Sequence, residues 1–278
     1  LLLYKKKKKK WDLIMFGIHS NHSLLFKRLG YDKLQPYDFS IHGRICGFSR
    51  KILWLEVVRS NNDPRIPARL FLDAVSELKG CPTIVRSDCG TENGIVAAIQ
   101  SFFRSSGVDA FAGERSHVYA SSHSNQQIEG WWSFLRRHRT SWWIDFLKDM
   151  VESNLLSLGN DLHMECLWFC FAHLLQADLD KVQEHWNSHC IRKSRFDTVA
   201  GVPDILYFLP ENFGKYDCLI PVNNQQIEAM EVHCQLDEPA ENLYFEYFES
   251  MLAEMNLKLP NNEEEALHLF QQLTSIQD

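Results

Sequence analysis

The stretch from residue 82 to residue 139 decides the fold of this chain. It begins with TIVRSDCG (residues 83–90), in which an apolar run ends in a carboxylate, Asp88, and then breaks at a glycine. It closes with SSHSNQQIEGWWSFLRR (residues 121–137), where Glu129 lies on a predicted helix that becomes aromatic and then basic. Two carboxylates placed on neighbouring elements in this way can share a divalent metal ion beside a phosphodiester.

Hydrophobic periodicity around this stretch predicts an α/β fold. Alternating and β-branched runs predict strands, and apolar residues at i, i+3 and i+4 predict helices. The expected strands are residues 40–48, 51–58, 83–88 and 117–120; the expected helices start at Pro64 (ending at Gly80), at Thr91 and before Glu129, and cover 142–156, 164–186, 242–255 and 262–273. The helix from Thr91 carries the apolar residues Ile95, Val96, Ile99 and Phe102. This order of elements predicts a mixed sheet flanked by helices.

Composition places the chain among ordinary globular proteins, with 45% hydrophobic and 23% charged residues. No apolar run is long enough to cross a bilayer, so no membrane association is expected. Eight cysteines without regular spacing predict reduced thiols inside the cell, in the nucleus or the cytoplasm. The net charge of −7 is concentrated in residues 237–278, so the rest of the chain is close to neutral. DNA binding would therefore have to come from local basic clusters.

The motif Ser-Asp-x-Gly-x-Glu-Asn (residues 87–93), followed by Ser-Ser-x-x-Asn-Gln-x-Ile-Glu-x-x-Trp (residues 121–132), resembles the integrase/transposase catalytic core. The resemblance runs from about Gly30 to about Glu211 and is to integrase-core-domain proteins of animal genomes, which derive from mobile elements. It implies a ribonuclease-H-like mixed sheet flanked by helices, with a helical C-terminal extension. The domains expected on this basis are a catalytic core at 29–158, its helical extension at 159–211 and an acidic C-terminal region at 212–278.

The resemblance also implies a catalytic site. Asp88 and Glu129 match the second and third members of the family's Asp-Asp-Glu triad, which binds Mg²⁺ or Mn²⁺. At the first position the family reads Trp-His-Ile-Asp-Gly, whereas this chain has Leu29 in place of the Asp. Asp32 would face away from the site unless the strand register shifted. Cys46 is a second departure, since relatives carry Asp there.

Two functions follow from these residues. One is an integrase/transposase-type core that binds DNA, with metal-dependent phosphodiester cleavage and strand transfer that is impaired because of Leu29. The other is a catalytically dead, domesticated binding or scaffolding protein. Intact Asp88 and Glu129 motifs favour the first, whereas Leu29, Cys46 and the acidic C-terminal region favour the second. A homodimer is expected from the relatives, and the acidic region is expected to meet an unidentified protein partner.

Several polar residues are candidate contacts to nucleic acid, each with an alternative role. They are Asn125, Arg136, Arg137, Arg192 and Lys193. Asn125 either caps the Glu129 helix or lies beside the active site. Arg136 and Arg137, together with Arg139, either contact phosphate or form a solvated basic helix end. Trp131 and Trp132 are expected in the core or at a dimer surface.

Two further motifs have competing interpretations. The lysine run at residues 5–10 makes residues 1–28 either a nuclear-import or phosphate-binding segment, or a disordered or mis-joined leader. The spacing Cys166-x3-Cys170 with His185-x3-His189 is compatible with structural zinc. However, the bulky apolar residues around both cysteines favour a buried helix instead.

Overall fold

The computed structural model describes residues 27–31, 33–87, 89–119, 126–193, 199–235 and 241–275. For residues 27–31, 126–130 and 241–242 it describes the backbone alone. The strands are β1 (Lys27–Tyr31), β2 (Ser40–Ile45), β3 (Ile52–Val58), β4 (Gly80–Cys81), β5 (Val85–Ser87), β6 (His117–Tyr119) and β7 (Ile220–Pro221). The α-helices are α1 (Arg65–Leu78), α2 (Gly94–Phe103), α3 (Gln126–Leu135), α4 (Ser141–Glu152), α5 (Asp161–Ser188), α6 (Pro203–Phe208), α7 (Asn224–Glu231), α8 (Glu241–Glu254) and α9 (Glu263–Thr274). The chain is therefore mixed α/β, as the sequence predicts.

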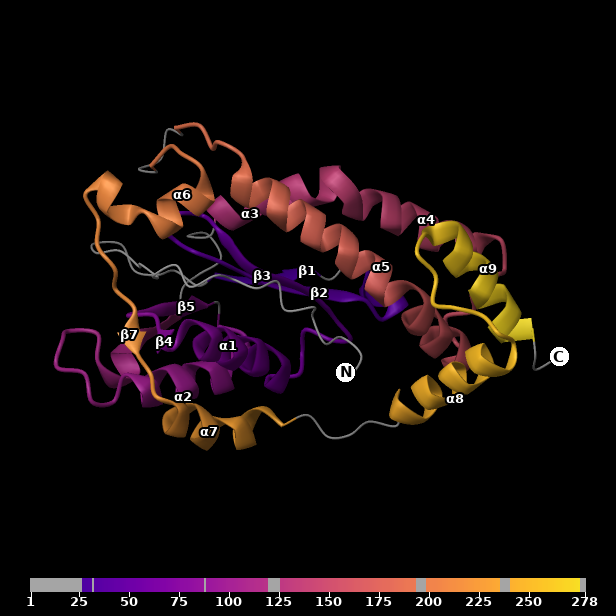
Figure 1. The fold of residues 1–278 in the computed structure, drawn as a ribbon, viewed down its shortest axis with the longest axis horizontal. Coiled ribbons are helices and arrows are strands. Elements are labelled where there is room, and N and C mark those ends of the chain that lie inside the picture. Colours follow the sequence, from indigo (N-terminus) through magenta and orange to yellow (C-terminus); the bar gives the residue numbers. More distant parts are fainter. Residues whose placement is uncertain are drawn as a thin grey trace.

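The strands form a central layer (Figure 1). β1, β2 and β3 are consecutive and antiparallel, whereas β5 and β6 pair in parallel. β1 also lies against β5. The five strands therefore follow one another in the spatial order β3, β2, β1, β5, β6, although hydrogen bonds join only the first three and the last two.

The helix α5 crosses one face of the β1–β3 sheet, with α3 and α4 beside it (Figure 1). Ile41 and Ile45 of β2 and Leu55 of β3 are buried in the same core cluster as Leu175 and Leu179 of α5. Strand alternation explains this arrangement, because residues two apart on a strand face the same side. The α5 helix begins at Asn160, whose side chain accepts hydrogen bonds from two backbone N–H groups of the first turn.

Amide side chains of α5 also bond to the outer edge of β3. Gln176 accepts from the N–H of Val57 (2.8 Å) and donates to the carbonyl of Leu55 (2.9 Å). Asn187 accepts from the N–H of Ile52 (2.8 Å) and donates to its carbonyl (2.9 Å). These side-chain amides form hydrogen bonds with backbone N–H and carbonyl groups at the edge of β3, which a neighbouring strand would otherwise bond.

A second core lies on the side of α1 and α2. It contains Phe71 and Val75 of α1 and Ile99 and Phe103 of α2. Of the apolar residues noted for this helix, Phe102 is 38% exposed, whereas Phe103 is buried. Phe103 follows Val96 by seven residues and Ile99 by four, so regular helical spacing places these three on one face.

The first helix of this second core ends differently from the prediction. Lys79, with φ of 51°, adopts the left-handed conformation after α1, and Gly80 begins β4 instead of ending the helix. A Cβ atom at position 80 would lie 2.6 Å from Leu219 Cγ, so a close approach to the segment before β7 explains the glycine.

The acidic C-terminal region contains the two predicted amphipathic helices, α8 and α9. Both pack against α5, and Phe248 of α8 and Phe270 of α9 are buried in its core cluster. The acidic side chains therefore cover the outside of helices whose apolar faces complete the larger core. Of the helices that the structure describes, none combines the length and apolar character needed for a membrane span.

Candidate metal and nucleic-acid site

The parallel strands β5 and β6 end at one edge of the sheet. Ser87 at the end of β5 is paired with Tyr119 at the end of β6. Asp88, which follows Ser87 directly, lies outside the described residues. β5 therefore ends, one residue before position 88, at the carboxyl edge of two parallel strands, an edge where α/β folds often place their ligands.

The other two triad positions lie on elements that adjoin this edge. Leu29, in β1, is paired with Gly43 of β2, and β1 lies against both β5 and α3. Glu129 belongs to α3, as predicted, although its side chain is not among those described. The structure thus places β1, which carries position 29, against α3, which carries position 129, and against β5, which ends one residue before position 88. A shared site between their side chains remains a prediction, and Asp32 and Asn125 also lie outside the described part of the chain.

A buried histidine contacts the end of β5, and no pattern in the sequence predicted this contact. His117 is 8% exposed, and its Nε2 lies 3.3 Å from the hydroxyl of Ser87. Burial, followed by the charge of Arg44, lowers the pKa of His117 to about 4. The ring is therefore neutral near pH 7 and contributes no charge beneath the predicted site.

Cys46 lies in the turn between β2 and β3, where relatives were expected to carry Asp. Its sulfur accepts a hydrogen bond from the N–H of Ser49 (3.5 Å), and its carbonyl accepts from the N–H of Arg50 (2.8 Å). Arg50 adopts a positive φ of 62° to close the turn. Cys46 is buried, which raises the pKa of its thiol. An acceptor at position 46 thus stabilises a turn, a role that thiol sulfur fills more weakly than a carboxylate.

Aromatic residues join α3 to the end of α5. Trp131 is fully buried, which confirms its predicted place in the core. Its ring meets that of Trp186 edge-on, with centroids 6.3 Å apart, and Phe134 meets Trp186 at 5.0 Å. These contacts fix the basic residues that follow α3 beside the C-terminal end of α5.

Of the three arginines in the turn directly after α3, two are exposed and available to contact phosphate. Arg136 and Arg137 are exposed and lie in a π-helical turn, Arg136–Thr140. Arg139, for which a phosphate contact and a solvated helix end were the two alternatives, is instead paired within the chain. Its guanidinium forms ion pairs with Asp178 and Glu263, and it packs over a tryptophan ring in α4.

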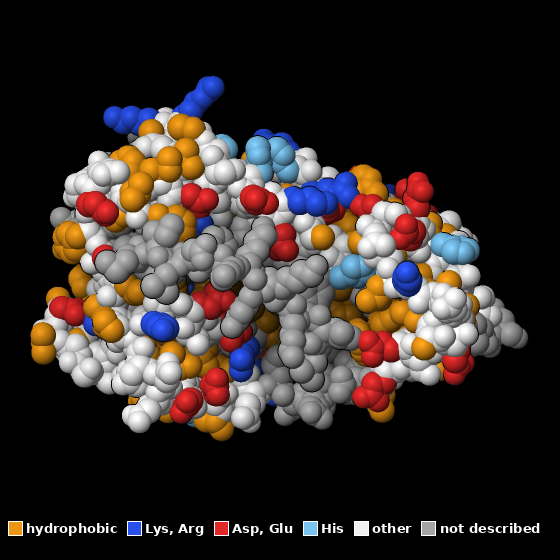
Figure 2. All heavy atoms as spheres, in the orientation of Figure 1, with side chains coloured by type: hydrophobic (Ala, Val, Ile, Leu, Met, Phe, Trp, Pro, Cys, Tyr) orange, Lys and Arg blue, Asp and Glu red, His pale blue; other side chains and the backbone are white. Residues whose placement is uncertain are grey.

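The second basic pair, Arg192 and Lys193, is exposed just beyond α5. The chain there is anchored by a β-bridge between Ile191 and Gly201 and by a hydrogen bond from the Trp186 indole to the carbonyl of Arg50 (2.7 Å). Both basic pairs therefore project from the place where α3 meets the end of α5. Lys, Arg and His side chains gather along this edge, over α3, α5 and α6 (Figure 2).

The four residues with zinc-like spacing do not share a site. Cys166 and Cys170 are buried, with their sulfurs 3.9 Å apart, and burial is the main cause that raises the pKa of Cys170. His185 and His189 lie toward the other end of the same helix, about 23 to 35 Å away at 1.5 Å per residue. Among the described side chains, which exclude those of Asp88 and Glu129, no group of three or more His, Cys, Asp or Glu could hold a metal ion.

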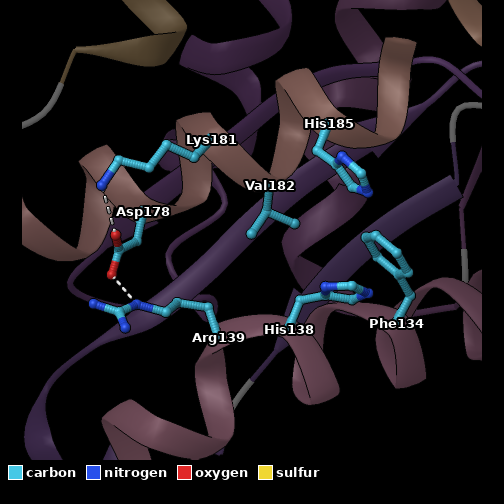
Figure 3. Close-up of a pocket in the computed structure, with 7 residues that line it drawn as sticks. All are labelled: Phe134, His138, Arg139, Asp178, Lys181, Val182 and His185. Carbon is cyan, nitrogen blue, oxygen red and sulfur yellow. Dashed lines mark hydrogen bonds and ion pairs between the residues drawn. The ribbon is translucent and has the colours of Figure 1, made fainter. Parts of the chain in front are cut away.

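A groove of about 390 Å³ opens between the π-helical turn and α5 (Figure 3). Phe134, His138 and His185 line one end, and Arg139, Asp178 and Lys181 line the other. The carboxylate of Asp178 accepts from Arg139, from the Trp143 indole (3.0 Å) and from Lys181 (3.1 Å). The groove thus joins an aromatic end to an ion-paired end. Nothing in the sequence pattern indicated it.

The comparisons with known proteins give one match. A family model described as "Integrase core domain" matches residues 19–204. No curated protein and no solved structure was found to match the chain. The matched range includes β1 through α5, and so contains every triad position and both basic pairs.

Proposed function

Because the chain belongs to the integrase core-domain family, we propose that it is a ribonuclease-H-like core that binds DNA, and that its ancestral strand-transfer chemistry is impaired by Leu29. The observation that carries this proposal is that β1 lies against both α3 and β5, and that β5 ends at Ser87, directly before position 88. The family places its carboxylates at positions 29 and 129, which belong to β1 and α3, and at position 88.

The order of the strands supports the fold assignment. Three antiparallel strands are followed by two parallel ones, with α1 and α2 on one side and α3 to α5 on the other (Figure 1). The sequence resemblance implied a mixed sheet flanked by helices, and this arrangement has that form. The extension to residue 211 continues as α5 and α6, in agreement with a helical addition to the core.

The metal ligands present do not fit a two-ion centre. Mg²⁺ and Mn²⁺ require hard oxygen ligands, and two adjacent ions need several carboxylate oxygens between them. At the three triad positions the chain offers Asp88 and Glu129 only, because the side chain of Leu29 has no donor atom. Position 29 is paired with Gly43, which likewise brings no donor from the adjacent strand. We therefore assign no catalytic step to the metal in this chain.

The DNA-binding part of the proposal depends on the two basic pairs. Arg136, Arg137, Arg192 and Lys193 are exposed and make no ion pair with any residue within the described ranges. Arg139, by contrast, is neutralised by two carboxylates. Free exposed cations on one edge provide the phosphate contacts on which sequence-independent DNA binding depends.

The alternative is a scaffolding protein that has kept the fold without DNA binding. Acidic α8 and α9, which pack on α5, favour this alternative because they place negative charge on a neighbouring surface. A protein partner for these helices and a homodimer are part of the same hypothesis.

Fluorescence anisotropy with a labelled blunt duplex tests DNA binding. The double variant Arg136→Gln/Arg137→Gln should weaken binding and reduce the slope of log K against log salt by about 2, since each phosphate contact contributes about 0.9. The matched control, Arg69→Gln/Lys148→Gln, removes the same charge from α1 and α4 and should leave the slope unchanged. Equal losses in both variants would show that net charge alone is responsible.

Calorimetric titration of Mg²⁺ or Mn²⁺ tests the site itself. We expect no binding, or binding in the millimolar range that disappears in both Asp88→Asn and Glu129→Gln. Tight binding by the unmodified chain would contradict the assignment of Leu29 as the cause of impairment and would point to Asp32 or another group as third ligand.

A further inference from the structure

The groove between the π-helical turn and α5 is not explained by a carboxylate site or by basic residues that contact phosphate. We propose that it binds one unpaired nucleobase of a single-stranded segment of nucleic acid. The proposal rests on the DNA-binding function above and adds a stacking site to it.

The aromatic end of the groove has the chemistry of a base-binding site. The ring centroids of Phe134 and His138 lie 4.0 Å apart, and that of His185 lies 6.0 Å from His138. Phe134 and His185 are parallel to within 6°, and Trp186 supports Phe134 edge-on. Both imidazoles point into the groove from opposite walls (Figure 3). Flat aromatic faces held in place in this way suit a planar ligand.

The imidazoles also have hydrogen-bonding capacity to spare. Apart from ring contacts, the His138 and His185 side chains make no interaction with the rest of the described chain. His189, by contrast, uses its Nδ1 on the carbonyl of Trp186 (2.8 Å). A ring nitrogen that faces a groove can donate to or accept from the polar edge of a base.

The ionic end argues against a charged ligand inside the groove. Asp178 is 8% exposed and is already bonded by Arg139, Trp143 and Lys181, while Arg139 is also bonded by Glu263. The two cations, Arg139 and Lys181, are already paired with the two carboxylates, so the groove offers an acidic peptide no unpaired positive charge. A transition metal is disfavoured because no three ligands come together among the described side chains. An uncharged planar group fits both ends.

The surroundings place phosphates next to such a base. Arg136 and Arg137 are exposed on the turn that forms one wall, and the Lys181 side chain, 76% exposed, lies at the rim of the other. Phe134 follows Glu129 by five residues on the same helix, which corresponds to about 8 Å along its axis. A strand whose base occupies the groove thus has its backbone next to the exposed basic pair.

The proposal is tested with a thymidine oligonucleotide that carries one 2-aminopurine, and with a blunt duplex as reference. Stacking should quench the 2-aminopurine fluorescence when the full chain binds the single strand. Phe134→Leu should weaken single-strand binding by about fivefold to 150-fold, the range for loss of one base–aromatic stack, and leave duplex binding unchanged. Phe102→Leu, which removes an exposed phenylalanine from α2, is the matched control.

A second variant keeps the test independent of folding defects. His185 is exposed, so His185→Gln removes the ring without disturbing the core, and it should reduce single-strand affinity and quenching in the same direction. Unchanged single-strand affinity in both variants, or an equal loss in Phe102→Leu, overturns the groove assignment while leaving duplex binding intact. Quenching that requires added Zn²⁺ also overturns it. Failure of the unmodified chain to bind either nucleic acid overturns the DNA-binding function as well.

Discussion

The side chain of Gln176 allows a direct test of how α5 is joined to the sheet. It lies buried against β3, where it accepts from the N–H of Val57 and donates to the carbonyl of Leu55. Those two backbone groups are on the outer edge of β3, which has no further strand beyond it in the described part of the molecule. Gln176→Met keeps a similar side-chain volume and removes both partners at once.

The size of the effect follows from the number of groups left without a partner. Each buried backbone group that loses its hydrogen bond costs about 1–3 kcal/mol. The Val57 contact is partly accessible and water recovers part of its cost, so Gln176→Met should lower the free energy of unfolding by about 2–4 kcal/mol. Asn187→Leu should cost less, about 1–2 kcal/mol, because the Ile52 carbonyl keeps a bond from Gln183 (3.1 Å) and only the N–H is stranded.

Guanidinium denaturation followed by tryptophan fluorescence measures these differences. The midpoint should shift while the slope stays constant, since neither change alters the surface exposed on unfolding. Gln271→Met, at an exposed position on α9, is the control and should fall within about 0.5 kcal/mol of the unmodified chain. The reasoning is refuted if Gln176→Met also falls within that range, or if Asn187→Leu is the more destabilising change.

Three further outcomes follow from the described contacts and from the triad. The pKa of His117 is about 4 in the folded chain against its usual 6.5, so between these pH values the unfolded chain binds a proton that the folded chain does not. The free energy of unfolding should therefore fall by up to about 3 kcal/mol as the pH is lowered from 6.5 to 4. Denaturation of His117→Leu across this pH range should show a flatter slope. Leu29→Asp should increase Mn²⁺ affinity by about tenfold or more in calorimetry, because it returns a third oxygen ligand; unchanged affinity would mean that position 29 does not face the site. Arg139→Met should lower the free energy of unfolding by about 2–4 kcal/mol in thermal or chemical denaturation, because the buried carboxylate of Asp178 loses a charged partner. A change of less than about 1 kcal/mol would contradict this account.

Local patterns predicted the elements that are long or strongly periodic. β2, β3 and α5 follow from alternation and from helical spacing of their apolar residues, although β2 is buried on both faces. The Glu129 helix and the two C-terminal helices were found in the same way. The triad positions came from the sequence resemblance instead. The structure adds that their elements adjoin, while their side chains lie outside what it describes.

Contacts between segments that are far apart in the sequence leave no local pattern from which they could be predicted. β4 and β7 have two residues each and pair across about half of the chain, so neither produces a periodic signal. The ion pair that takes Arg139 away from phosphate comes from Glu263 on α9, a partner that no local rule identifies. In both cases the deciding interaction is tertiary.

Retention of this fold is not evidence for retained catalysis, for an electrostatic reason. Three carboxylates around an empty metal site would repel one another, which raises their pKa values and destabilises the metal-free protein. Leucine at position 29 removes one of those charges, while the backbone pairing with Gly43 can be made by any residue. Loss of the first aspartate would therefore cost the metal-free fold nothing and could stabilise it, as substitutions at active sites often do. An impaired integrase core and a binding protein share this fold and its stability, so metal affinity with and without Leu29→Asp is the property that separates them.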